Sequence, residues 1–145
     1  MIKQFNNLSE EEARILLKAP ALISVNAACS LNAVDPTQKA DAIRLSHLKT
    51  FTAHPMLIPY YTEVEKHFKD DFVAAVQLYH PFNREKMDKL RRDIDQIRKV
   101  VQKLEPEYAR LLLKSFEKYE RHVRRAAHNF VQDFIFPIPI PGLSD

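Results

Sequence analysis

Hydrophobic residues recur every three or four positions in two successive stretches of the C-terminal half of the chain. The first stretch comprises Met87, Leu90, Ile94, Ile97, Val101 and Leu104, and the second comprises Ala109, Leu112, Phe116, Tyr119, Val123, Ala126 and Phe130. This spacing places the apolar side chains of each stretch on one face of an α-helix. The pattern predicts a long antiparallel hairpin that turns near Pro106 and packs its two stripes against each other, or one helix kinked at that proline.

A helix is also predicted near the N-terminus. Ser9 followed by Glu12 forms a capping box, which predicts a helix that begins near Glu10 and ends near Cys29. The second half of this segment carries small or apolar residues on nearly every side, which is typical of a helix at the centre of a bundle. Pro20 removes one backbone donor and is expected to kink or divide the helix.

Two further helices are predicted between these elements. Asp35 and Pro36 suit the N-cap and first position of a helix that would end before His54. Pro59 begins the next segment, whose apolar residues again recur every three or four positions until His80, which precedes a proline.

Alternating isoleucine and proline distinguish the residues that follow Asp133. This alternation is incompatible with a helix and favours extended or polyproline II backbone. We therefore expect an all-α, single-domain bundle of about five helices over residues 1–133. An extended tail over residues 134–145 is expected to pack on the bundle or on a neighbouring subunit.

Composition removes several classes of protein. The 145 residues include one glycine, Gly142, so the glycine-rich loops of nucleotide-binding folds are excluded. The net charge of +3 is concentrated in residues 81–145, but this tilt is too mild to indicate a nucleic-acid partner. One cysteine, Cys29, the lack of a signal-type leader and the lack of a membrane-length apolar run predict a cytoplasmic protein with no membrane partner.

One row of side chains is a candidate metal site. Glu63, His67 and Asp71 follow one another at intervals of one helical turn, so they share a face of the predicted third helix. Carboxylates and imidazoles are ligands of divalent metals. The alternative, which we favour, is a solvated flank, because three ligands on one helix need others from elsewhere. We expect no resident cofactor unless a divalent metal binds here.

A second candidate cluster, Arg121, Arg124 and Arg125, lies late in the last predicted helix. Arginines in this pattern can bind phosphate or an acidic partner. A charged, solvated face that complements the helix dipole is the other interpretation, and we favour it. No nucleophile, base and orienting group are brought together by any motif, so we do not expect an enzyme.

The segment from Glu12 through Ala21-Leu22-Ile23-Ser24-Val25-Asn26-Ala27-Ala28, with the helix start at Asp35-Pro36-Thr37-Gln38, resembles the first hairpin of the TerB-like tellurite-resistance family. The resemblance covers residues 12–50 and implies an all-helical fold. The family's Asp-Gly turn is replaced here by Asn32-Ala33-Val34-Asp35. If the family's acidic turn binds metal, Asp35 is the candidate that this resemblance leaves.

Together these patterns favour a non-catalytic intracellular interaction or scaffold protein. The long apolar stripes and the apolar tail offer more apolar surface than a five-helix monomer needs to bury. We therefore expect a homodimer or other homo-oligomer. We also expect a protein partner that the sequence does not identify. The alternative is a TerB-like, stress-related protein that binds a metal or a small ligand.

Overall fold

The computed structural model describes residues 2–29 and 54–135, with side chains left out for residue 29 and residues 126–135. This part of the chain is helical and contains no strand, which confirms the predicted all-α class. Two short 3-10 turns, η1 and η2, accompany four long helices. The elements are η1 (Lys3–Phe5), α1 (Glu10–Cys29), η2 (Pro55–Leu57), α3 (Ile58–Tyr79), α4 (Arg84–Val101) and α5 (Pro106–Ile135).

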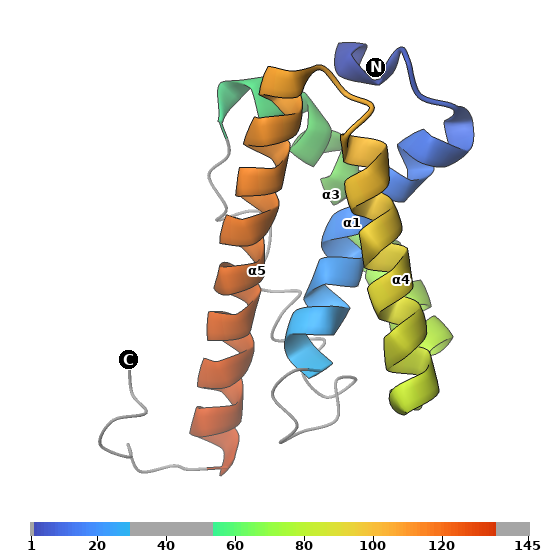
Figure 1. Ribbon diagram of the computed structural model, residues 1–145. Coiled ribbons are helices and arrows are strands. Elements are labelled where there is room, and N and C mark those ends of the chain that lie inside the picture. Colours follow the sequence, from blue (N-terminus) through green and yellow to red (C-terminus); the bar gives the residue numbers. More distant parts are fainter. Residues whose placement is uncertain (1, 30–53, 136–145) are drawn as a thin grey trace.

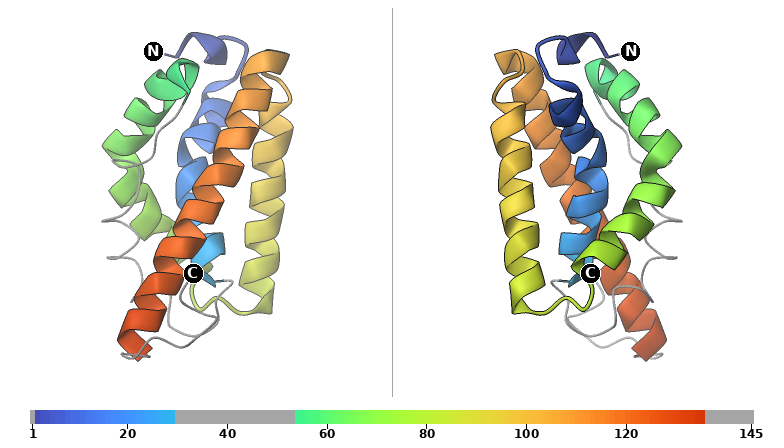
Figure 2. Two further views of the ribbon diagram at one scale, coloured as in Figure 1. Left: turned by 90° about the vertical axis from the view of Figure 1, so that its left-hand side faces the viewer. Right: turned by 90° about the vertical axis from the view of Figure 1, so that its right-hand side faces the viewer.

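Helix α1 lies at the centre of the described bundle. It packs against α3, α4 and α5, and each of these contacts is more extensive than any contact among the outer three helices. Figures 1 and 2 show α1 enclosed on three sides, with α3, α4 and α5 arranged around it. The central position predicted from its small residues is therefore confirmed.

The predicted packing of the two C-terminal stripes against each other is wrong. Helices α4 and α5 are antiparallel and joined at one end, yet they contact each other much less than each contacts α1 (Figure 1). Both stripes instead bury their large side chains around α1, as Leu90 and Leu112 do. The stripes pack on α1 because its buried residues include Ala19, Ala27 and Ala28. These small side chains let three neighbouring helices approach closely.

The turn between α4 and α5 resolves the alternatives at Pro106. Helix α4 ends at Val101 and α5 begins at Pro106, so the chain forms a hairpin and not one kinked helix. Glu105 accepts hydrogen bonds from the backbone N–H groups of Glu107 and Tyr108, at 3.1 and 3.0 Å. The proline occupies the first position of α5, where a missing N–H costs nothing.

The capping box predicted at the start of α1 is present, and a side chain also caps α4. In the capping box, Glu12 N–H donates to Ser9 Oγ at 3.1 Å and Ser9 N–H donates to Glu12 Oε1 at 3.0 Å. Asn83 Oδ1 accepts from Lys86 N–H at 2.9 Å at the start of α4. Helix α3 ends at Tyr79, as the following His-Pro dipeptide predicted.

Some predictions fall outside the described residues. They are the second helix, from about residue 36 to residue 53, the side chains of Cys29, Ala126 and Phe130, and the tail from residue 136 onward. Helix α5 extends to Ile135 and so includes the first two residues of the predicted tail. Pro137 disfavours helical backbone only from the residue before it, so the helix can continue to residue 135.

Pro20 does not divide α1, which is continuous from Glu10 to Cys29. A proline at this position cannot donate to the carbonyl of Leu16, one turn earlier. The Tyr60 hydroxyl of α3 donates to that carbonyl instead, and both side chains are buried. Tyr60 thus satisfies the backbone acceptor that Pro20 leaves without its usual partner.

A second hydroxyl network joins α1 to α5. Ser24 Oγ donates to the Pro20 carbonyl at 2.8 Å and lies 2.9 Å from the Tyr119 hydroxyl. A serine hydroxyl has one hydrogen, so Tyr119 must be the donor to Ser24. Nearby, the Tyr61 hydroxyl of α3 lies 2.5 Å from Ser115 Oγ of α5. Side-chain hydrogen bonds therefore connect α1, α3 and α5 in pairs.

Tyr108 differs from these tyrosines. Its side chain is fully buried, and its hydroxyl has no hydrogen-bond partner within the described part of the chain. Burial of a hydroxyl without a partner costs free energy, so this group is a local defect in the core.

Tyr60→Phe and Tyr108→Phe should have opposite effects on stability. Tyr60→Phe leaves the Leu16 carbonyl buried and unpaired, so we expect the free energy of unfolding to fall by about 1–3 kcal/mol. Tyr108→Phe removes an unpaired hydroxyl, so stability should be unchanged or rise. Urea unfolding followed by circular dichroism measures both variants, and equal losses would contradict this account.

The fold should lose stability above pH about 10, the pKa of tyrosine in an unfolded chain. Burial raises the pKa of Tyr60, Tyr61 and Tyr119, and raises the pKa of Tyr108 to about 12. The folded state therefore favours the neutral phenols, and this contribution is complete below pH about 10 and is lost as pH rises. Tyrosinate absorbance should appear together with loss of helical circular dichroism. Ionisation of all five tyrosines near pH 10 without unfolding would be inconsistent with this burial.

Candidate functional site

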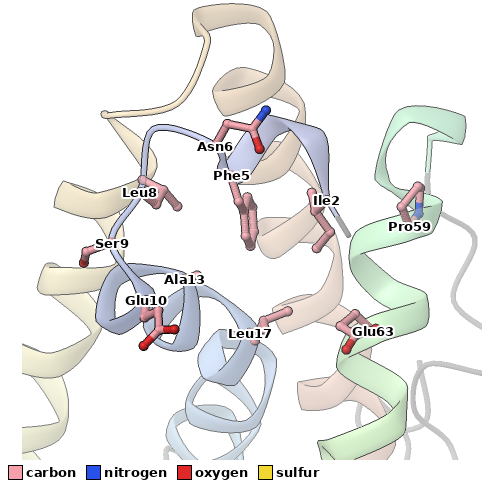
Figure 3. A pocket seen from close by; sticks show the side chains of 10 residues that line it. All are labelled: Ile2, Phe5, Asn6, Leu8, Ser9, Glu10, Ala13, Leu17, Pro59 and Glu63. Atoms are coloured by element: carbon pink, nitrogen blue, oxygen red, sulfur yellow. The ribbon is translucent and has the colours of Figure 1, made fainter.

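A pocket with a volume of about 620 Å³ lies between the N-terminal segment, α1 and α3 (Figure 3). Volumes of this size are typical of small-ligand sites. Six apolar residues form most of its lining: Ile2, Phe5, Leu8, Ala13, Leu17 and Pro59. Phe5, Leu8 and Leu17 remain partly exposed, so the pocket presents apolar surface to solvent.

The N-terminal segment, residues 2–9, forms one wall of this pocket. Backbone N–H groups of Phe5 and Leu8 donate to the carbonyls of Ile2 and Phe5, at 3.1 and 2.9 Å. The ring of Phe5 packs edge-on against Tyr60, with 6.1 Å between ring centroids, and Ile2 is buried. The same tyrosine that pairs with the Leu16 carbonyl therefore also positions a wall of the pocket.

The charged side chains of the pocket are both acidic. Glu10 of α1 and Glu63 of α3 line it on either side of Leu17 (Figure 3), and none of the described lining residues is lysine, arginine or histidine. Lys66, 3.1 Å from Glu63, lowers the pKa of that carboxyl, which is therefore ionised at neutral pH. Arg14 lies 3.7 Å from Glu10, and both of those side chains are largely exposed.

A second concave surface lies between α4 and α5 and has a volume of about 340 Å³. We call it the α4–α5 groove. Its apolar lining comprises Ile23, Ile94, Ile97, Leu113 and Phe116. Arg98 lines it from α4, while Glu117 and Glu120 line it from α5. The groove therefore has an apolar centre with a basic group along one side and acidic groups along the other.

The predicted metal row has other surroundings. Glu63 is paired with Lys66, His67 is exposed, and Asp71 is partly buried, which raises the pKa of its carboxyl. Within residues 2–29 and 54–135, no group of three or more His, Cys, Asp or Glu side chains is arranged to hold a metal ion. The structure thus places these three residues along α3 without bringing them into one ligand set.

The predicted arginine cluster lies within α5. Arg124 Nε donates to Glu120 at 3.0 Å, and its guanidinium forms an ion pair with the same carboxylate. Arg121 and Arg125 are exposed. This pairing within one helix resembles an ordinary i,i+4 ion pair of a solvated face more than a converging anion site.

Two features of these surfaces escaped the sequence analysis. The N-terminal pocket depends on Ile2, Phe5 and Leu8, whose three-residue spacing was the available signal before the first predicted helix. Glu10 was identified only as the expected start of the first helix, and its position across the pocket from Glu63 required the tertiary structure.

No family model, curated protein or solved structure matches this chain. The resemblance of residues 12–50 to the TerB-like family stays a prediction. None of the helices in the part of the chain that the structure describes is long and apolar enough to span a bilayer.

Divalent metals should leave the melting temperature nearly unchanged, because Glu63, His67 and Asp71 do not form a ligand set. The measurement compares thermal unfolding of chelator-treated protein with and without Zn²⁺ or Mn²⁺. A rise of several degrees that His67→Ala abolishes would restore the metal interpretation.

Proposed function

We propose that this protein is a non-catalytic helical interaction module that forms homodimers through the α4–α5 groove. The single observation that carries the proposal is the groove itself, with its apolar centre and opposite charges along its two sides. A second copy of the chain is the occupant that this arrangement fits best.

The apolar centre supports association. Ile94 and Leu113 are partly exposed, and they adjoin the buried side chains of Ile97 and Phe116. A contiguous apolar strip of this kind, rimmed by charged residues, is typical of a protein interface. Because α4 is about 27 Å long, the face is modest in size, and we expect a dimer with micromolar affinity.

The charges favour one symmetric arrangement. When a two-fold axis runs parallel to the helices above the groove, α4 of one copy lies over α5 of the other, in antiparallel orientation. Arg98 of each copy then faces Glu117 of the other. An axis perpendicular to the helices would place α4 over α4 and bring like charges together, which is unfavourable.

The serine hydroxyls in the described part of the chain have structural roles, which supports a non-catalytic function. Ser9 caps α1, whereas Ser24 and Ser115 are buried against tyrosine hydroxyls. These hydroxyls are committed to the fold, so they do not provide an exposed nucleophile beside a base.

Charge reversal across the groove tests the proposal. Arg98→Glu and Glu117→Arg should each weaken dimerisation by about three- to tenfold, because each places like charges opposite each other. The double variant should restore much of the lost affinity. Sedimentation equilibrium over a range of protein concentrations measures the dissociation constants.

Lys118→Glu is the matched control, because Lys118 is exposed on α5 and does not line the groove. It should leave dimerisation unchanged. A strictly monomeric wild type would overturn the proposal. Equal weakening by Lys118→Glu, or a double variant weaker than both single variants, would overturn the assignment of this groove.

A further inference from the structure

We propose that the pocket between the N-terminal segment, α1 and α3 binds a small amphiphilic amine, a molecule with an apolar body and a single ammonium end. The apolar body would lie against Phe5, Leu8 and Leu17, and the ammonium would lie at the edge of the pocket beside Glu63. This inference goes beyond the proposed self-association, because it concerns different residues on a different surface.

The apolar lining sets the first requirement for a ligand. Side chains from three separate segments converge on a volume of about 620 Å³, and the three most central ones stay partly exposed. Each square ångström of apolar surface that a ligand covers contributes about 25 cal/mol, so an aliphatic or aromatic body is favoured. A fully polar ligand would leave this surface without a matching partner.

The charges set the second requirement. Glu10 and Glu63 come from different helices and lie on opposite sides of Leu17 (Figure 3), so the pocket has one carboxylate on each side. No basic residue lines the pocket among the residues described. A ligand with a carboxylate or phosphate would be repelled there, whereas an ammonium group would be attracted.

Protein cations compete for these carboxylates, and His67 and the N-terminal amine also lower the pKa of Glu63. Lys66 pairs with Glu63 and Arg14 pairs with Glu10, but both cations are more than half exposed and lie within one turn of their partners. Exposed pairs of this kind contribute at most about 1 kcal/mol each. A ligand ammonium held by its buried apolar body can therefore share or replace them at small cost.

Three eight-carbon probes separate the two requirements: octylamine, octan-1-ol and octanoate. Titrations would be followed by chemical-shift changes of backbone amides in two-dimensional NMR spectra. We expect octylamine to bind about three- to tenfold more tightly than octan-1-ol, and octanoate to bind most weakly. The shifts should concentrate on residues 2–17 and 59–63, and the preference for the amine should decrease with added salt.

Substitutions on α3 sharpen the test. Glu63→Gln should reduce octylamine affinity by about threefold and leave octan-1-ol affinity unchanged. Lys66→Gln should raise octylamine affinity, because it removes the cation that forms an ion pair with Glu63. Glu65→Gln is the matched control, since Glu65 is exposed on the same helix and does not line the pocket.

Each alternative outcome has a distinct meaning. Equal affinity for the three probes would overturn the choice of an amine, and the absence of shifts in residues 2–17 would overturn the site. Loss of affinity in Glu65→Gln equal to that in Glu63→Gln would also overturn it, because a diffuse charge effect would then suffice. None of these results depends on dimerisation, since Arg98 and Glu117 report on the groove separately.

Discussion

The whole bundle depends on covering α1 on three sides without leaving its backbone groups unpaired. A helix covered in this way needs a narrow surface, which Ala19, Ala27 and Ala28 provide. It also needs a partner for every buried polar atom. The carbonyl that loses its normal donor at Pro20 is the critical case, and Tyr60 of α3 supplies that donor. Close packing and hydrogen bonding thus both favour the arrangement of the outer helices around α1.

Local features of the fold could be predicted because their causes are local. The Ser9 cap, the Asn83 cap and the helix start at Pro106 depend on residues within one turn of each other. The neighbours of each apolar stripe could not be predicted, because a three-to-four spacing defines which face is buried and not which helix covers it. The long-range pairs illustrate this limit: Tyr60 lies 44 positions from Leu16 and Tyr119 lies 95 positions from Ser24.

The candidate site was harder to predict for the same reason. Glu63 was selected for its alignment with His67 on one helix, but the structure relates it to Glu10 through the pocket and to Lys66 through an ion pair. Regular spacing along a helix produces an aligned row of polar groups whether or not they face a ligand. Convergence from several segments, which distinguishes a pocket, arises from tertiary contacts that spacing does not encode.

The Tyr60 hydroxyl compensates for Pro20, so substitutions at these two positions are expected to depend on each other during evolution. If alanine replaced Pro20, its N–H could bond Leu16 within the helix, and Tyr60 would lose one reason to be a tyrosine. If phenylalanine replaced Tyr60 first, the lineage would pass through a less stable ancestor. We therefore expect Pro20 to be replaced before Tyr60 during evolution. Descendants that retain Pro20 should also retain Tyr60.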